Sequence, residues 1–282
     1  MSATELQDRL AENAGSIVGK PVIEVRNLDA HYGETQILHG IDLAVPAGEI
    51  MVIMGGSGSG KTTLLRHLIG IERPTAGTLE LLGQELERLG AIETLKLRRQ
   101  IGVAFQGGAM FSSLTVMENI KLPLREHTRL DETTMDIMAR MKLEVVNLSG
   151  SGELMPAELS GGMLKRAAVA RAIIMDPKLL FFDEPSAGLD PVVSAALDEL
   201  ILRLRDAMQM TIVVVTHEVE SALAIADRIT ILDSGRVIEV DTPEAIRNSR
   251  NPRVHNLLNR KSQKEELDPD EYLRRLTGTR TG

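Results

Sequence analysis

One segment of this chain restricts its fold more than any other: a glycine-rich loop between an apolar stretch and a helical pattern. The apolar stretch is Ile50 to Met54, and the helical pattern runs from Lys61 to Ile69. Gly55 to Thr62, which connects the two, matches G-x-x-x-x-G-K-[ST] in full. This pattern cradles phosphate groups when a strand precedes it and a helix follows. It predicts a nucleotide site formed by Gly55, Gly56, Ser57, Gly58, Ser59, Gly60, Lys61, Thr62 and Thr63.

The residue types in this loop suit phosphate chemistry. Closely spaced glycines let backbone N–H groups converge on a polyphosphate, and the following helix presents its positive N-terminal end to the anion. Lys61 supplies a compact positive charge for the outer phosphates, and the hydroxyl of Thr62 can bind Mg²⁺. A plain glycine-rich turn with a surface lysine is the alternative, but it does not account for the strand, glycines, lysine and threonine together.

Composition narrows the class of protein. The 282 residues suffice for one large domain or two modest ones, and 43% hydrophobic with 26% charged residues is typical of a globular protein. Apolar runs such as Leu179 to Phe182 are far shorter than the roughly 20 residues that cross a bilayer. The chain has no cysteine, and Met1 to Lys20 contains no apolar signal segment, so we expect a cytosolic protein. The net charge of −8 disfavours broad nucleic-acid binding.

Short β-branched stretches alternate with helical patterns, which predicts an α/β fold. The early stretches are closely spaced, as in an antiparallel layer, whereas the later ones alternate with helices, as in a mainly parallel core sheet. Between Val116 and Leu159 the pattern is mostly helical, which predicts a helical subdomain inserted at about residues 107–160. The predicted strands are Val22 to Arg26, Ile41 to Val45, Ile50 to Met54, Thr78 to Leu82, Ile101 to Phe105, Leu179 to Phe182, Thr211 to Val215, Ile229 to Leu232 and Val237 to Val240.

The predicted strand Leu179 to Phe182 ends in two carboxylates, Asp183 and Glu184. In a phosphate-loop enzyme such a strand lies beside the loop, so that one acid can hold the metal while the other faces a water in line with the terminal phosphate. Acids after a strand are more often the polar start of a turn. The phosphate loop in the same chain favours the catalytic interpretation.

A third motif precedes these acids: Leu159, Ser160, Gly161, Gly162 and Met163 open a helical pattern that runs to about Met175. By itself the motif could be an N-capping serine with turn-forming glycines. In its place after the phosphate loop and before the carboxylates, it resembles the signature motif of ABC-type ATPases. The resemblance extends from Val22 to about Ala245.

The resemblance implies ATP hydrolysis with Mg²⁺ and assigns roles along the chain. Glu184 would be the general base or the carboxylate that orients the attacking water, with His217 as the switch histidine and Gln106 as the Q-loop glutamine. The metal ligands would be Thr62, Gln106 and Asp183. The remaining nucleotide contacts would come from an adenine-stacking aromatic, the signature motif and the D-loop aspartate: Tyr32, Ser160, Gly161, Gly162 and Asp190.

Two positions depart from the usual ABC pattern. Met163 stands where the signature commonly has glutamine, and Gly56 stands where many members have proline. The chain contains one phosphate loop, one pair of acids and one signature helix, and in the family a signature helix closes over ATP held by the opposite subunit. The resemblance therefore implies a second copy, or a similar chain, as partner, with ATP acting as a clamp between the two.

Local strings favour one branch of the family. Pro123 to Thr128, Leu154 to Pro156 and the methionine-ended signature resemble the ATPase subunits of bacterial phospholipid transporters that maintain outer-membrane lipid asymmetry. This implies a permease that binds the region around Leu114 to Leu124, an MCE-domain lipid-binding protein, a small STAS-domain protein, and a location on the cytoplasmic face of the inner membrane. Alternatives are an amino-acid, metal or lipoprotein transporter, or a soluble ABC mechanoenzyme acting on DNA, ribosomes or another protein. We expect no nucleic-acid partner.

The termini are predicted to lie outside the ATPase domain, which we place at residues 21–245. Residues 1–20 are expected to be flexible, and residues 246–282 to form a tail. Within the tail, Asp268 to Gly278 has the capping pattern of a short helix. A helix so short needs a surface to rest on, and we expect the neighbouring ATPase subunit to provide it. A solvated, frayed tail is the alternative.

Overall fold

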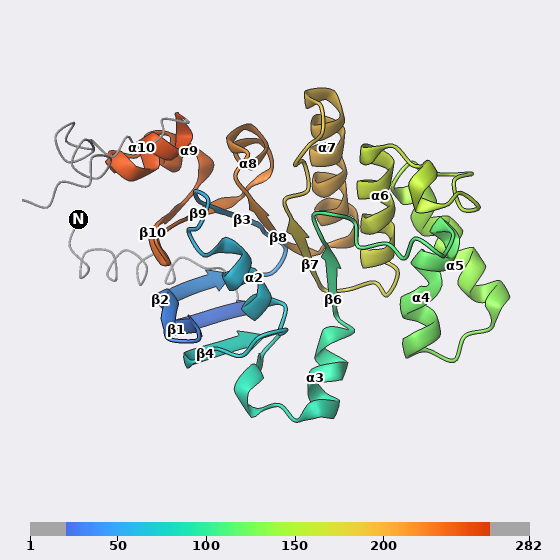
Figure 1. Ribbon diagram of the computed structural model, residues 1–282, viewed down its shortest axis with the longest axis horizontal. Coiled ribbons are helices and arrows are strands. Elements are labelled where there is room, and N and C mark those ends of the chain that lie inside the picture. The colour runs from blue at the N-terminus through green and yellow to red at the C-terminus, as the bar shows by residue number, and fades with distance from the viewer. Residues whose placement is uncertain (1–20, 260–282) are drawn as a thin grey trace, which may run out of the picture.

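The computed structural model describes residues 21–259 and confirms the predicted α/β fold (Figure 1). Its strands are β1 (Ile23–Tyr32), β2 (Thr35–Val45), β3 (Ile50–Met54), β4 (Ala76–Leu81), β5 (Gln84–Glu85), β6 (Ile101–Ala104), β7 (Leu179–Asp183), β8 (Thr211–Thr216), β9 (Arg228–Asp233) and β10 (Arg236–Asp241). A four-stranded antiparallel sheet has the order β2-β1-β4-β5, and a six-stranded sheet has the order β10-β9-β3-β8-β7-β6. In the larger sheet the strands from β9 to β6 are parallel, and β10 runs antiparallel at one edge.

The helices cover both faces of the larger sheet and form a separate lobe at one end of the molecule (Figure 1). They are α2 (Lys61–Leu68), α3 (Ala91–Arg98), α4 (Val116–His127), α5 (Glu132–Val145), α6 (Gly161–Ala172), α7 (Pro191–Met208), α8 (Val219–Ile225), α9 (Pro243–Arg247) and α10 (Pro252–Leu258), with short 3₁₀ turns η1 (Leu86–Arg88) and η2 (Pro156–Glu158). The lobe consists of α4, α5 and the adjoining part of α6. α4 and α5 occupy the stretch where the sequence predicted mostly helix, and α6 follows it.

Every predicted strand overlaps an observed one, but the early part of the chain differs in detail. β1 continues to Tyr32, beyond its predicted end. The register is irregular between Val25 and Leu28, where Asn27 has φ 49°, and this breaks the alternation of side chains from which the strand was predicted. The two-residue strand β5 was not predicted. The grouping of the early strands into an antiparallel layer is wrong for β3, which lies inside the parallel sheet.

The position of β3 follows from burial on both of its faces. All five of its residues are buried. Ile50, Val52 and Met54 belong to a hydrophobic core shared with the helices, whereas Met51 and Ile53 belong to a second core shared with the antiparallel sheet. A strand without a polar side is expected in the middle of a covered parallel sheet. The phosphate loop therefore follows a strand that is buried along its whole length.

The helical lobe is held together by polar anchors as well as apolar packing. Thr115 caps α4 through a capping box with Glu118. Asn119 is fully buried and bonds the backbone of Phe111, Leu114 and Thr115, which fixes the loop that leads into α4. These contacts give the loop after β6 a defined shape.

A buried cation joins α4 to α5. Lys121, whose side chain is 8% exposed, forms ion pairs with Glu132 at 3.0 Å and with Asp136. Its hydrogen bonds are the main reason that the pKa of both carboxyls lies below the ordinary values of 4.5 and 3.8. A carboxyl whose pKa is lowered by folding stabilises the fold above its ordinary pKa, and this stabilisation is lost as the pH falls through the lowered value.

We expect Lys121→Met to have a lower thermal unfolding midpoint than wild type near neutral pH, with the gap closing as the pH is lowered through the carboxyl range. The physical reason is that both proteins have lost the ion pairs once Glu132 and Asp136 are protonated. Thermal unfolding followed by circular dichroism across that pH range measures the gap. Lys96→Met, at an exposed lysine on α3, is the control. A constant gap at all pH values would contradict this account.

The folded unit extends past the predicted domain boundary at residue 245. That boundary falls inside α9, and Ile246 and Val254 of α9 and α10 are fully buried in the core shared with the helices. The predicted tail, residues 246–282, therefore begins too early. The predicted segment 1–20 and the predicted helix from Asp268 to Gly278 lie outside the described residues.

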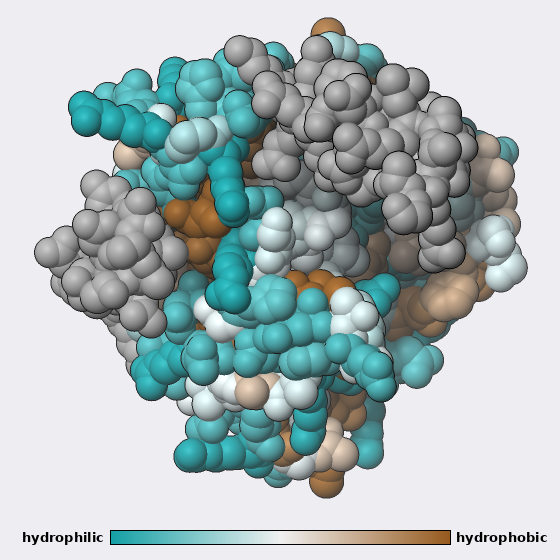
Figure 2. All heavy atoms as spheres, turned by 60° about the vertical axis from the view of Figure 1, so that its left-hand side comes forward, coloured by the Kyte–Doolittle hydropathy of each residue, from teal (hydrophilic) through white to brown (hydrophobic). Residues whose placement is uncertain are grey.

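The surface seen in Figure 2 is mostly hydrophilic, with hydrophobic atoms in smaller patches between polar side chains. Within residues 21–259, none of the helices combines the length and the apolar character that crossing a bilayer requires. Larger exposed apolar side chains occur on α5 and on the loop that leads into α4, among them Ile137, Met141 and Phe111.

Candidate nucleotide site

The predicted site residues from four strands meet at one edge of the parallel sheet. Met54 of β3 pairs with Thr216 of β8, and Val215 of β8 pairs with Asp183 of β7. The phosphate loop follows β3, and Gln106 follows β6, the strand beyond β7. Ligands of open α/β sheets bind at the carboxyl ends of the parallel strands, which is where all these residues lie.

The backbone of the phosphate loop requires glycine at particular positions. Gly58 and Gly60 have φ of 76° and 101°, in the left-handed region that favours glycine. Gly60 is the N-cap of α2 and offers no side chain to the first N–H groups of the helix. At Gly55 a Cβ would lie less than 3.0 Å from the carbonyl oxygen of Leu232 and from the Ser59 hydroxyl. The loop thus leaves backbone N–H groups at the helix N-terminus to an anion.

Lys61 lies across the loop. Its Nζ donates to the carbonyl oxygens of Gly55 at 2.8 Å and Gly56 at 3.0 Å. Burial lowers the pKa of Lys61, against the opposing charges of Glu184 and Asp183. The ammonium group is therefore held inside the loop, within electrostatic reach of Asp183 and Glu184, where it can meet a phosphate.

The remaining loop side chains divide between solvent and interior. Ser57 and Thr62 are exposed, whereas Ser59 and Thr63 are buried. Within residues 21–259, the hydroxyl oxygen of Ser59 has no hydrogen-bond partner. Thr62, in the first turn of α2, is exposed, so its hydroxyl is accessible from solvent.

Glu184 has an unusual backbone and a fixed side chain. Its φ of 47° is in the left-handed region, which costs a non-glycine residue about 1–3 kcal/mol and is often found at functional sites. Its carboxylate accepts from the Thr216 hydroxyl at 3.1 Å and from the backbone N–H of His217 at 3.3 Å. The Nδ1 atom of His217 lies 2.9 Å from the other carboxylate oxygen.

Asp183, the last residue of β7, differs electrostatically from Glu184. Burial raises the pKa of Asp183, and the nearby charge of Glu184 raises it further, while Lys165, Lys61 and Arg66 act in the opposite direction. Two neighbouring acids in one half-buried place favour a cation between or beside them.

Strand β8 lies between β3 and β7, so the acid-bearing strand is not hydrogen-bonded to the strand that leads into the phosphate loop. Strand β8 contributes Thr216, which is fully buried and donates a hydrogen bond to the carboxylate of Glu184. Sequence reasoning missed Thr216. The available signal was a hydroxyl residue at the end of an otherwise apolar strand, directly before His217.

Tyr32 lies at the end of β1 and is 45% exposed. Its hydroxyl accepts from Arg66 of α2 at 2.8 Å and donates to Glu72 at 3.1 Å. Arg66 and Glu72 were also missed from the sequence. They connect the predicted adenine-stacking residue to the helix that follows the phosphate loop.

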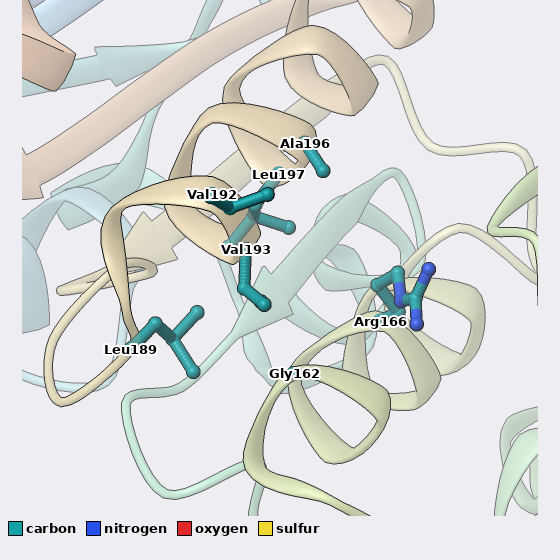
Figure 3. A pocket seen from close by; sticks show the side chains of 7 residues that line it. All are labelled: Gly162, Arg166, Leu189, Val192, Val193, Ala196 and Leu197. Carbon is teal, nitrogen blue, oxygen red and sulfur yellow. The ribbon is translucent and has the colours of Figure 1, made fainter.

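The signature motif forms the N-terminus of α6, in a part of the molecule separate from α2 (Figure 1). The Ser160 hydroxyl accepts from the N–H of Met163 at 3.3 Å, so the capping role considered for this serine is present. A Cβ at Gly162 would lie 2.5 Å from Val193 of α7, whereas Gly161 is exposed. Figure 3 shows the groove between α6 and α7, of about 120 Å³, lined by Gly162, Arg166, Leu189, Val192, Val193, Ala196 and Leu197.

Asp190 and Gln106 lie on exposed segments. Asp190 caps α7 by accepting from the N–H groups of Val192 at 3.1 Å and Val193 at 3.0 Å. The backbone oxygen of Gln106 accepts from Lys165. The structure thus brings together the phosphate loop, Asp183, Glu184 and His217 in one chain, and leaves the signature residues elsewhere on the surface.

Comparison with known proteins agrees with this arrangement. The family model described as ABC transporter matches residues 38–187. The intermembrane phospholipid transport system ATP-binding protein MlaF of Haemophilus influenzae is 43% identical over 237 residues, which is 84% of this chain and 90% of that protein. The chain belongs to the ABC transporter ATP-binding family. Its relatives include MlaF of Escherichia coli K12, at 40% identity over 84% of this chain and 88% of that protein. They also include the probable ribonucleotide transport ATP-binding protein mkl of Mycobacterium leprae, at 38% identity over 84% of this chain and 68% of that protein.

Solved structures of ABC ATPases share the fold. The ATP-binding cassette MJ0796, in a dimeric post-hydrolysis state bound to ADP and Pi, has a TM-score of 0.72 and 30% identity, covering 78% of this chain and 98% of that one. The structure of cbiO1 from Clostridium perfringens has a TM-score of 0.76 and 26% identity, covering 91% and 100%. The chain is therefore the ATP-binding and ATP-hydrolysing subunit of an ABC transporter. ABC cassettes dimerise, as MJ0796 does.

Met163 stands where the ABC signature commonly has glutamine, and its side chain is partly buried against the core shared with the helices. Its N–H, not its side chain, bonds Ser160. We expect Met163→Gln to leave ATP turnover within about tenfold of wild type, or ~1.4 kcal/mol of barrier. A steady-state phosphate-release assay on the purified chain, alone and with its partners, measures this. A larger loss would assign the methionine side chain a role in turnover.

Proposed function

We propose that this chain powers a transporter that moves phospholipid between the inner and outer membranes of a bacterium. Alignment with the two MlaF proteins, over 84% of this chain and 88–90% of theirs, carries the proposal. The mycobacterial relative has similar identity, but only 68% of its length is aligned, so its overall length differs more. The strings Pro123 to Thr128 and Leu154 to Pro156, together with the methionine-ended signature, support the same branch.

The site residues suit hydrolysis of ATP. The loop N–H groups and Lys61 would hold the β- and γ-phosphates, and Tyr32 would stack on adenine. Glu184, oriented by Thr216 and His217, would accept a proton from the attacking water or orient that water. His217 is 55% exposed at the site, so its ring can also contact the γ-phosphate.

The donor set fits Mg²⁺. The hydroxyl of Thr62, the amide of Gln106 and the carboxylate of Asp183 are hard oxygen donors of the kind that this ion prefers. Burial raises the pKa of Asp183, so a cation beside it would stabilise the ionised form. When bound, Mg²⁺ would neutralise charge on the phosphates.

Transport would require a second copy or a similar chain. Ser160, Gly161 and Gly162 belong to the start of α6, and α6 lies apart from α2, the helix that follows the phosphate loop (Figure 1), so they can serve a nucleotide held by the partner. Asp190 follows the acids along the chain and directly follows Leu189, which lines the groove between α6 and α7, so it would contribute at the same interface. ATP would close the pair and hydrolysis would release it.

The permease would bind the helical lobe. Asn119 fixes the backbone of Phe111, while the Phe111 ring is 54% exposed. A large aromatic side chain presented on a fixed loop suits a protein contact. An MCE-domain lipid-binding protein and a small STAS-domain protein would complete the complex at the cytoplasmic face of the inner membrane.

The test is purification of the tagged full-length chain from its native host in mild detergent, followed by identification of bound proteins and extraction of bound lipids. We expect a permease, an MCE-domain protein and phospholipid. Phe111→Asp is the matched control, because it alters the lobe surface outside the nucleotide site and should retain ATP binding while losing the permease. Recovery of a permease for nucleotides, amino acids, metals or lipoproteins would overturn the phospholipid proposal.

A further inference from the structure

Two cations of α6 hold the segment that follows β6. Arg171 donates to the carbonyl oxygens of Ala109 at 2.7 Å and Gly108 at 2.9 Å. Lys165, earlier on the same helix, donates to the carbonyl oxygen of Gln106. Both Gly108 and Ala109 have positive φ, so this segment departs from regular structure where the cations hold it. The backbone of Gln106 is thus attached to the helix that begins with the signature motif.

Lys165 makes one contact that Arg171 does not. Its Nζ also donates to the backbone oxygen of Glu184 at 3.1 Å. A single ammonium group therefore joins the backbones of two residues whose side chains are assigned to the γ-phosphate end of the site. Lys165 lines a small pocket together with Phe105, Phe182 and Pro185, and these neighbours limit the freedom of its side chain.

The contact to Glu184 falls on a strained residue. Glu184 has φ of 47°, and its N–H donates to the carbonyl oxygen of Val215 at 2.8 Å. Lys165 holds the carbonyl at the other end of the same residue. A left-handed conformation of a non-glycine residue persists only when its surroundings fix it, and β8 and Lys165 fix both ends here. Charge-assisted hydrogen bonds of this kind are about twice as strong as neutral ones.

We propose that Lys165 is a positioning residue that ties Gln106 and Glu184 to the signature helix of their own chain. Movement of α6, as when the partner's ATP engages the signature motif, would then reach the backbone of both residues through one side chain. The proposal rests on the roles of Gln106 and Glu184 given under the proposed function. Lys165 itself would not touch ATP.

The experiment compares Lys165→Met, Lys165→Arg and Arg171→Met in the full-length protein, with kcat, the Kd for a fluorescent ATP analogue and the thermal unfolding midpoint measured for each. For Lys165→Met we expect kcat to fall at least about tenfold, since small displacements of catalytic groups cost that much or more. We expect its Kd to stay within about threefold of wild type, because the lost contacts affect turnover rather than binding. Lys165→Arg should restore most of kcat, because its guanidinium can donate to both carbonyls.

Arg171→Met separates positioning from packing. It removes contacts to the same segment but none to Glu184, so its kcat should exceed that of Lys165→Met even if its unfolding midpoint falls as far. Wild-type kcat in Lys165→Met, or equal losses of kcat in the methionine variants of Lys165 and Arg171, would overturn the proposal. If Lys165→Met does not fold, Lys165→Leu, which likewise has no hydrogen-bond donor, with wild-type kcat would overturn it as well. Glu184→Gln in the same assay separates failure of this proposal from failure of the proposed function. Normal turnover in that variant would contradict the catalytic role of Glu184, on which the role of Lys165 depends.

Discussion

Glu184→Gln is expected to bind ATP with nearly wild-type affinity and to lose at least about a hundredfold in turnover, the usual contribution of a general base. The amide cannot accept a proton from water, yet it can keep the hydrogen bond from the Thr216 hydroxyl, so the geometry of the site should survive. Because hydrolysis is what would release the clamp, ATP should hold the variant as a dimer. Phosphate release, fluorescent nucleotide binding and size-exclusion chromatography with light scattering measure the three quantities.

The matched control is Glu220→Gln, which removes the same charge from an exposed position on α8. It should retain both turnover and the wild-type monomer–dimer balance. Normal turnover in Glu184→Gln would require a different base. Loss of ATP binding in that variant would show instead that the carboxylate is needed to form the phosphate site, and the assignment of Glu184 to hydrolysis would fail.

The sequence predicted those parts of the site that come from local motifs. The phosphate loop, the acids after β7 and the signature serine each lie within a few residues of a strand or helix end, so their secondary-structure context was visible. β3 could be placed as a strand because its residues are all apolar, yet its sheet could not be assigned from the spacing of its neighbours.

Contacts across the chain could not be predicted in the same way. Thr216 reaches Glu184 from a strand that sequence order places after α7, and Lys165 reaches two carbonyls that are far apart in sequence. Neither residue type is unusual at its position. Arg66 and Glu72 hold Tyr32 through a similar long-range contact. Such partners depend on strand order and helix placement, which no local pattern encodes.

Gly55→Ala is expected to lose at least about tenfold in ATP affinity, ~1.4 kcal/mol, because the added carbon displaces the loop that wraps the phosphates. A Cβ there would lie less than 3.0 Å from the backbone oxygen of Leu232, which belongs to β9 and cannot turn aside like a side chain. Overpacking of this kind typically costs about 1–3 kcal/mol of folding free energy. The thermal unfolding midpoint should therefore fall as well.

Gly56→Ala is the neighbouring control, since a Cβ at Gly56 meets no atom within 4 Å and its φ is not positive. The two variants add the same methyl group to adjacent residues of one loop, so any difference between them reports the packing against β9 and not the loss of a glycine as such. We expect Gly56→Ala to bind ATP and to unfold like wild type. Equal losses of affinity in both variants would show that the loop needs flexibility at Gly56, and would contradict the steric account of Gly55.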